Sequence, residues 1–444
     1  MCSLITNNTI GIEGFSTSTR GIGGKIRKYL DDFIVEELIP YRGGFRRVNE
    51  LNLNRGEKGL FTHLIIRKEG IDTPETVQLI AQKLGISVED IGYAGNKDKR
   101  AIAIQRMSVW KVTSGDLCRK LSKLKNIHIL AAYPARYGVK LGDLWGNQFR
   151  IRIQNIKIPK DQIFERIKHI KEEIRNAGVP NFFGPQRFGE RFISHIVGKK
   201  LLMGQIKDAI MLYLSRTSQN EPVQIRVIRE KICEEQNFSK SLEQIPKKYQ
   251  YERRILRFLS RRPNDFKGAL SVFPRRILSL FIHAYQSWLF NKYLSERLNY
   301  FDSWQNPLPG DLVKIKEKIE FITENNIEMY QNLVNKGKIY VMGPLFGYKS
   351  LIPRGFPGEI FNKILQAESI HSKIFKQNDR RITSLGSLRR ISCFPYKLKT
   401  QILVLPQENV AVDLTFCLEK GSYATIVLRE FMKEGTLAKQ VINK

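Results

Sequence analysis

One carboxylate, Asp98, stands among cations in the stretch GYAGNKDKR, which runs from Gly92 to Arg100. Lys97 precedes it and Lys99 follows it. Four roles fit such a residue: a salt-bridged turn residue, a metal ligand, a nucleotide-specificity Asp, or a nucleophile. Neighbouring cations favour the ionised form of a carboxylate, which makes it a poor general acid but an available nucleophile. The same cations can hold phosphate groups beside it.

Other reactive patterns are weaker. Asn96-Lys97-Asp98 begins like the guanine-binding NKxD motif, but Lys99 stands where the Asp of that motif belongs, and no GxxxxGK[ST] phosphate loop occurs. The five cysteines include no CxxC pair, and no two of the six histidines lie three to five residues apart, so no zinc pattern appears. A metal-dependent nuclease would need clustered carboxylates. We interpret the available pairs, Asp31-Asp32 and Glu36-Glu37, as polar residues that flank a strand.

Charge is the strongest global signal. Lys and Arg total 74 against 43 Asp and Glu, a net charge of +31. Such an excess favours a polyanionic partner, with nucleic acid ahead of an anionic membrane surface. A thermophile's charge-rich surface would enrich Glu together with Lys. The N-terminus does not resemble a signal peptide and no run of 18 apolar residues occurs, so we expect a soluble intracellular chain.

The elements around Asp98 alternate between strands and helices, which predicts an α+β fold. We expect strands over 25–38 and 62–70, and a helix that starts with Thr73 as its N-cap and ends at Gly85. Apolar residues recur at helical spacing from 77 to 84. The segment 101–110, directly after the Asp98 turn, is predicted to be a strand.

Farther along, residues 147–155 (NQFRIRIQN) alternate between two faces. Phe149, Ile151 and Ile153 share the apolar face, and Arg150, Arg152 and Gln154 share the polar one. We expect a helix over about 275–298, two strands within 401–421 and a final helix from 422. The charge-dense block 215–270 is either a binding surface for RNA backbone or a solvated helix face.

Six segments, in this order, resemble the TruD family of tRNA pseudouridine synthases. They are GGKIRKYLDDFIVEE (23–37), GYAGNKDKRAIAIQ (92–105), GNQFRI (146–151), GVPNFFGPQRFG (178–189), HAYQSWLFN (283–291) and GSYATIVLREFM (421–432). GPLFGYK (343–349) and QSWLFN resemble the archaeal branch. The resemblance covers nearly the whole chain.

The resemblance implies a pseudouridine-synthase catalytic domain, with a mixed central β-sheet flanked by helices, interrupted by an α/β TRUD insertion domain. We place the catalytic domain at 1–177 and 395–444 and the insertion at 178–394. The implied activity is cofactor-free and metal-free isomerisation of a tRNA uridine to pseudouridine in the cytoplasm, with no membrane or protein partner. By family analogy the target is uridine 13, or the anticodon-stem position of tRNA-Tyr in the archaeal branch.

The resemblance also implies roles for single residues. Asp98 aligns with the catalytic nucleophile, which acts on a uridine whose base is flipped out of its stack. Lys97 aligns with a companion basic residue, and Arg27 stands where a Lys is usual. Asn147 matches an Asn that supports the catalytic loop in the family, and Phe149 matches an aromatic residue that stacks on the target base. Tyr423 matches an aromatic residue that closes the pocket.

The residues alone leave other interpretations open. By its pattern Phe149 is a core residue in line with Ile151, and Tyr423 is the first apolar position of a helix. Two rival functions also remain: a catalytically silent RNA-binding or ribosome-assembly protein on the same fold, and a metal-dependent nuclease.

Overall fold

The computed structural model describes residues 7–50, 59–219, 221–301, 303–405 and 410–433, which divide into two compact units. Of the described residues, one unit holds 17–175 and the segment that runs from Phe394 to Lys433, and the other holds 7–16 and 176–393. The α+β prediction is confirmed, since a mixed central sheet is combined with helices. None of the helices in these ranges has the length and apolarity needed to cross a membrane.

The first unit is built on a mixed sheet of nine described strands, which contains Asp98 at the end of one hairpin. The main order is β14-β15-β7-β1-β5-β3-β6, and β2 and β4 are added to β1 and β5. β1 and β5 pair in parallel, and the other pairs are antiparallel. The strands are β1 Phe33–Tyr41, β2 Gly44–Arg47, β3 Phe61–Glu69, β4 Ile91–Tyr93, β5 Ile102–Trp110, β6 Ile127–Ala135, β7 Gly146–Ile153, β14 Tyr396–Val404 and β15 Val410–Glu419.

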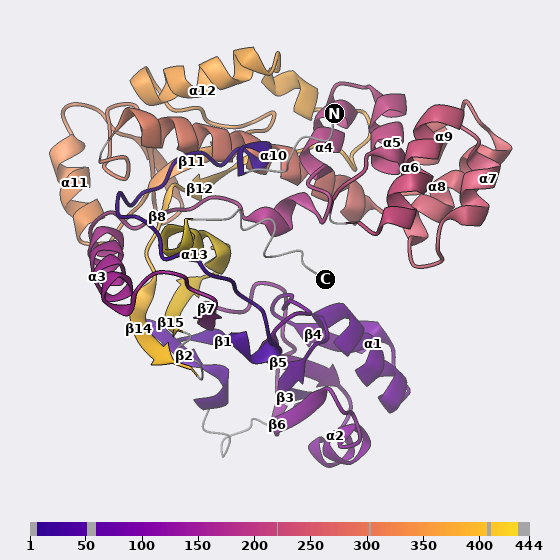
Figure 1. The fold of residues 1–444 in the computed structure, drawn as a ribbon, viewed down its shortest axis with the longest axis horizontal. Helices are drawn as coiled ribbons and strands as arrows, with labels where there is room; N and C mark the ends of the chain where they lie inside the picture. The colour runs from indigo at the N-terminus through magenta and orange to yellow at the C-terminus, as the bar shows by residue number, and fades with distance from the viewer. Residues whose placement is uncertain (1–6, 51–58, 220, 302, 406–409, 434–444) are drawn as a thin grey trace. The chain divides into compact units, whose positions relative to one another are not determined.

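Helices pack on this sheet through apolar stripes. They are α1 Thr73–Leu84, α2 Ser114–Leu121, α3 Lys160–Ala177 and α13 Ala424–Met432. The helical spacing predicted from 77 to 84 is confirmed, because α1 and α2 bury their apolar faces against β3, β4 and β5; Figure 1 shows both helices beside these strands. Gly85 ends α1 with a φ of 71°, a left-handed conformation that favours glycine.

Three local predictions are wrong. The N-cap of α1 is Asp72, whose side chain accepts from the Glu75 amide, rather than Thr73. The strand expected over 25–38 begins only at Phe33, because Arg27 has a φ of 60° and residues 30–32 form a 3-10 turn. Glu36 and Glu37 do not flank the strand: both lie inside β1 and are buried. An extended strand tolerates neither a positive φ nor a helical turn, so the chain bends before β1.

The second unit is mainly helical. Its helices are α4 Ser194–Leu202, α5 Ile206–Ser215, α6 Val223–Glu235, α7 Phe238–Gln244, α8 Gln250–Arg261, α9 Phe266–Leu270, α10 Arg275–Tyr300, α11 Ile327–Asn335 and α12 Gly355–Ala367. A sheet in the order β10-β9-β11-β12 consists of β9 Leu312–Ile315, β10 Lys318–Phe321, β11 Val341–Leu345 and β12 Ser387–Arg390, and β8 Val179–Pro180 pairs with β13 Ser392–Cys393. The charge-dense block 215–270 is therefore helical, and α6 to α9 gather together (Figure 1).

His195, near the start of α4, makes the second unit sensitive to acid. Its ring is 6% exposed and stacks on Trp288 with 6.0 Å between centroids. Burial lowers the pKa of His195 to about 4, below the value near 6.5 of an unfolded chain. Between about pH 6.5 and pH 4, His195 is therefore protonated in the unfolded chain but neutral in the folded one. The folded state loses stability as the pH falls through this range.

We expect the free energy of unfolding to drop by about 3 kcal/mol across that window on account of His195, at roughly 1.4 kcal/mol per pKa unit. His195→Gln should remove most of this acid sensitivity in urea unfolding curves recorded from pH 7 to pH 4. The exposed His371 supplies the control, and His371→Gln should leave the pH dependence unchanged. An equal pH dependence in wild type and His195→Gln would contradict this assignment.

Candidate active site

Asp98 lies in the turn that joins β4 to β5. The two strands are antiparallel, with Tyr93 opposite Met107, so the loop between them closes a hairpin at the edge of the unit's sheet. The Asp98 side chain is 43% exposed, and its Oδ2 accepts from Nη2 of Arg27 at 2.6 Å. The carboxylate is thus open to solvent on one side and fixed by a cation on the other.

Arg27 is a buried cation with several restraints. Its side chain is 6% exposed, and its guanidinium lies 4.2 Å from the centroid of the Phe33 ring. Arg100 donates to the Arg27 carbonyl oxygen at 3.2 Å. A guanidinium held over an aromatic ring keeps its planar fork in one orientation. Arg27 therefore presents a positioned charge to Asp98.

The cations adjacent in sequence to Asp98 have other partners. Lys97 Nζ lies 3.3 Å from Glu37 Oε2, with 4% and 0% of the two side chains exposed, and Lys99 pairs with Glu75 at 3.0 Å on the surface. Burial raises the pKa of Glu37, while Lys97 and Arg106 oppose that rise. The cation paired with Asp98 comes instead from a position 71 residues away.

Buried polar groups make hydrogen bonds with the backbone of the Asp98 loop. The Lys97 amide donates to Thr73 Oγ1 at 2.9 Å, and that hydroxyl donates to Gln105 Oε1 at 2.9 Å. Lys68, which is 0% exposed, donates from Nζ to the carbonyl oxygens of Ile71, of Lys97 at 3.3 Å and of Asp98 at 3.5 Å. Burial lowers the pKa of Lys68 to about 8. The backbone on both sides of the Asp98 side chain is thus tied to one ammonium group.

We expect Lys68→Met to reduce activity at least tenfold with little change in stability at pH 7. The substitution removes the cost of a buried ammonium, about 3 kcal/mol from its pKa, and leaves carbonyls unsatisfied at about 1–3 kcal/mol each. At about 1 kcal/mol for each of the three carbonyls, the low end of that range, the two terms nearly cancel, whereas the Asp98 loop loses its support. Thermal unfolding and the turnover number of the same sample measure the two effects.

The pH dependence of stability identifies the role of Lys68 independently. The folded pKa lies below the unfolded value near 10.4, so wild-type stability should rise between about pH 8 and pH 10.4 as the unfolded chain alone binds the proton. Lys68→Met should lack this rise. The control is Lys83→Met, at an exposed position of α1, which should keep both the increase in stability with pH and full activity. Loss of that increase in Lys83→Met would contradict the assignment to Lys68.

Asn147 and Phe149 lie on β7, and the register brings them beside β1. Asn147 is opposite Glu37 and Leu418, and Phe149 is opposite Val35 and Phe416. Directly opposite residues of antiparallel strands share a face. The prediction that Asn147 and Phe149 share one face is therefore confirmed.

Phe149 is 8% exposed, and its ring packs 6.1 Å from Phe33 and 5.6 Å from Phe416. Phe33 in turn carries the Arg27 guanidinium. Phe416, Phe149 and Phe33 thus form a continuous row of rings that ends at Arg27, the partner of Asp98. Phe149 is a mostly buried member of this row.

Four polar atoms near Asp98 have no hydrogen-bond partner among the described residues. They are Nε of Arg27, Oε1 of Glu37, Nε2 of Gln105 and Oδ1 of Asn147. Buried polar atoms are almost always satisfied in folded proteins, and exceptions concentrate where a ligand, water or ion completes them. Arg27 contacts Asp98 and Glu37 contacts Lys97, so two of these four residues are linked directly to the Asp98 loop, which makes this region a candidate site.

Tyr423 is half-buried at the N-terminus of α13, and its carbonyl accepts from the Ile426 amide at 3.0 Å. It follows β15, whose Glu419 is opposite Gly146 at the start of β7. Its predicted place at a helix start is confirmed. No described group of three or more His, Cys, Asp or Glu side chains is arranged to hold a metal ion.

Sequence reasoning missed Lys68 and underestimated Glu37. The sequence contains a signal for both residues, because each is a charged residue at a position where the alternation of its strand predicts an apolar one. Lys68 is in phase with the buried Leu64 and Ile66, and Glu37 is in phase with Phe33 and Val35. A charge on the core face of a strand needs a partner, and such partners are often functional.

The protein is thus a basic protein with a half-exposed carboxylate at the edge of a mixed sheet. Comparison with known proteins identifies its family. The family model for tRNA pseudouridine synthase D (TruD) matches residues 9–431. The chain belongs to the TruD family of tRNA pseudouridine synthases, which are tRNA-modifying isomerases.

Individual relatives agree over almost the full length. The chain is 32% identical over 437 residues to a "Probable tRNA pseudouridine synthase D" of Methanosarcina acetivorans, with 96% of each chain covered. It is 33% identical over 430 residues to a protein of the same name from Pyrococcus abyssi, with 94% of this chain and 98% of the relative covered. A crystal structure of the "Putative tRNA pseudouridine synthase D (TruD)" of Methanosarcina mazei matches with a TM-score of 0.80 and 31% identity, covering 97% of this chain and 98% of that one.

Proposed function

We propose that this chain converts uridine 13 of tRNA into pseudouridine and that Asp98 is the nucleophile. The observation that carries the proposal is the Asp98 carboxylate, 43% exposed and ion-paired with the buried Arg27 at 2.6 Å. An ionised carboxylate that is both accessible and positioned can attack an electrophilic carbon and later leave it. Membership of a tRNA-modifying family supports tRNA as the substrate.

The reaction balances without any added reagent. The bond between N1 of uracil and C1′ of ribose breaks, and a bond between C5 and C1′ forms. C5 loses its hydrogen as a proton and N1 gains a proton, so substrate and product are isomers. The chain's own task is to hold the detached base while it rotates and to stabilise the sugar, and Asp98 serves that purpose.

The target base must leave its stack before Asp98 can reach it. Flipping costs a few kcal/mol, and contact with an aromatic ring returns roughly 1–3 kcal/mol per base. We propose that Asn147 meets the base through its unsatisfied Oδ1, while Tyr423 closes the pocket. Phe149, with little of its ring exposed, would offer the base only an edge unless the pocket opens on binding.

The roles of the two units belong to the same proposal. The unit with the nine-stranded sheet would be the catalytic domain, since it contains Asp98, Arg27 and Asn147. The unit of residues 7–16 and 176–393 would be the family-specific insertion together with an N-terminal segment. The sequence placed residues 1–16 with the catalytic domain, whereas the described residues 7–16 group with the other unit.

A modification assay tests the proposed function. The protein is incubated with unmodified tRNA transcripts, which are then treated with carbodiimide and read by primer extension. We expect one new alkali-resistant stop at position 13 and none in a transcript with cytidine there. A stop only in the anticodon stem of tRNA-Tyr would show that this position, and not position 13, is the target. No stop in any transcript would favour a catalytically silent RNA-binding protein.

A further inference from the structure

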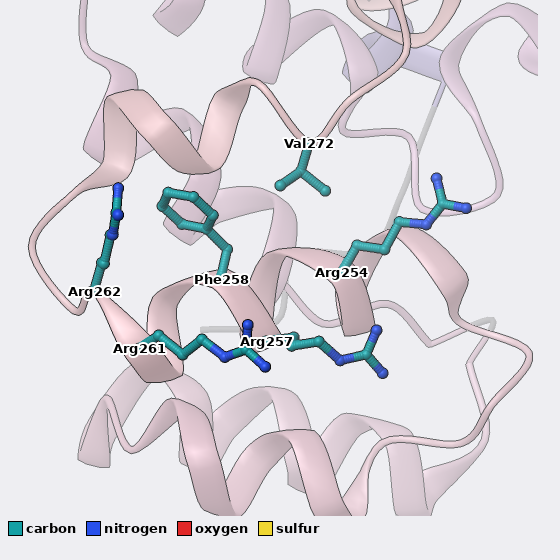
Figure 2. Close-up of a pocket in the computed structure, with 6 residues that line it drawn as sticks. All are labelled: Arg254, Arg257, Phe258, Arg261, Arg262 and Val272. Carbon is teal, nitrogen blue, oxygen red and sulfur yellow. The ribbon is translucent and has the colours of Figure 1, made fainter.

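Three arginines on one face of α8 have side chains with no partner within the described residues. The side chains of Arg254, Arg257 and Arg261 are exposed and make no ion pair, hydrogen bond or ring contact there. Their spacing of three and four residues places them on one side of the helix. Together with Phe258, Arg262 and Val272 they line a pocket of about 440 Å³, which Figure 2 shows.

Other arginines of this region hold the fold instead. Arg253 donates to the carbonyl oxygens of Leu242 at 2.8 Å and Ile245 at 2.6 Å. Arg229, which is 1% exposed, pairs with Glu221 at 2.9 Å and with Glu252 of α8 at 3.1 Å. Arg229 and Arg253 thus fix α8 in place, and the three outward arginines are not needed for that purpose.

A solvated charged face does not account for this arrangement well. Exposed helices usually mix the two signs, since like charges three or four residues apart each cost a few tenths of a kcal/mol. Glu252 is the single acid of α8 and is buried, so no carboxylate of the helix lies among the outward arginines. An anion bound in the pocket would remove this repulsion.

The chemistry of the lining favours a nucleic acid backbone over a lipid surface. Arginine forks bind phosphate with two parallel hydrogen bonds, and an aromatic floor suits a ribose or base. Phe258 is half-buried and packs so closely under Gly268 that a Cβ there would lie 2.5 Å from its Cζ. A ring held in this way cannot insert into a bilayer, as membrane-binding helices require.

We propose that the Arg254–Arg257–Arg261 pocket binds consecutive phosphates of the tRNA backbone. The proposal rests on the proposed function, because it takes tRNA as the substrate. It assigns RNA binding to a named surface of the second unit, separate from the residues that surround Asp98. Its contribution is to affinity for the RNA, since none of these arginines belongs to the Asp98 site.

Binding measurements test the pocket without turnover. All variants are made in the Asp98→Asn background, and affinity for a tRNA transcript is measured by fluorescence anisotropy at several salt concentrations. Substituting Arg254, Arg257 and Arg261 together by Gln should raise Kd about tenfold or more near 0.15 M salt. The log–log salt slope should become shallower by about 2, at roughly 0.7 to 0.9 per phosphate.

Two further variants separate geometry from charge. Replacing the same three arginines by Lys keeps the charge but loses the planar fork, so Kd should rise less than with Gln. The control removes equal charge from exposed positions elsewhere in the unit, with Lys336, Lys338 and Arg380 changed to Gln. We expect that control to stay within about threefold of the background, and circular dichroism to show that each variant folds.

The outcomes distinguish this inference from the proposed function. Unchanged tRNA affinity in the Gln variant, or an effect equal to that of the control, would overturn the pocket assignment. Loss of binding to phosphatidylglycerol vesicles with unchanged tRNA affinity would overturn it in favour of a lipid surface. If wild type forms no pseudouridine but the Gln variant still loses tRNA affinity, the proposed function falls and the pocket assignment stands.

Discussion

Asp98→Asn is expected to abolish pseudouridine formation and to leave the Kd for tRNA within about threefold of wild type. The amide has nearly the shape of the carboxylate but is neither charged nor nucleophilic. Asp98 is half-exposed, and its side chain pairs only with Arg27 among the side chains of the described residues, so its replacement removes little packing. Residues that act in covalent catalysis typically cost several orders of magnitude in turnover when they are removed. Single-turnover modification and a binding isotherm measure the two quantities.

A carboxylate elsewhere in the same unit provides the control for that experiment. Glu89 is exposed in the turn before β4, and Glu89→Gln should keep full turnover. If Asp98→Asn lost tRNA binding or its folded structure instead, Asp98 would be a structural turn residue. Measurable turnover in Asp98→Asn would show that another group performs the chemistry.

Arg27→Met is expected to lower kcat about 100-fold. A hydrogen bond between charged groups contributes about 1.5–3 kcal/mol, which corresponds to roughly 10- to 150-fold in rate if the contact is needed in the transition state. Arg27 both orients Asp98 at 2.6 Å and lies over Phe33 at 4.2 Å, so a neutral side chain forfeits both contacts. Single-turnover rates at saturating tRNA measure this effect apart from binding.

Arg27→Lys distinguishes the charge from the guanidinium shape. Lysine keeps a positive charge beside Asp98, and the family resemblance implies a Lys at this position, so we expect Arg27→Lys to retain activity within about tenfold of wild type. Lys25 is an exposed cation of the same segment, and Lys25→Met should change kcat less than twofold. Equal losses in Arg27→Met and Lys25→Met would mean that only the local positive charge matters.

Regular elements were predictable where one physical pattern dominated. Residues 147–153 alternate because one face of β7 packs in the core, and Phe149, Ile151 and Ile153 are buried as predicted. Gln154, which was placed on the polar face with Arg152, is 5% exposed and donates to Asp32 at 2.5 Å. The pattern gave the polar character of this position but not its burial, because burial depends on the contact with Asp32.

The Asp98 site was predictable in its residue types but not in its partners. Adjacent cations suggested that Lys97, Lys99 and Arg100 neutralise Asp98, whereas Lys97 pairs with Glu37 and Lys99 with Glu75. The pairing with Arg27 depends on a left-handed residue in a segment that its sequence pattern marked as a strand. Such long-range contacts follow from the parallel pairing of β1 with β5, which no local pattern encodes.

The most direct measurement of the central claim is a crystal structure of Asp98→Asn bound to an unmodified tRNA transcript. We predict that uridine 13 lies outside its stack, with its C1′ about 3–3.5 Å from the side chain of residue 98, the separation of reacting groups before attack. A complex in which that uridine remains stacked, or in which another carboxylate lies against the flipped nucleotide, would contradict the role of Asp98.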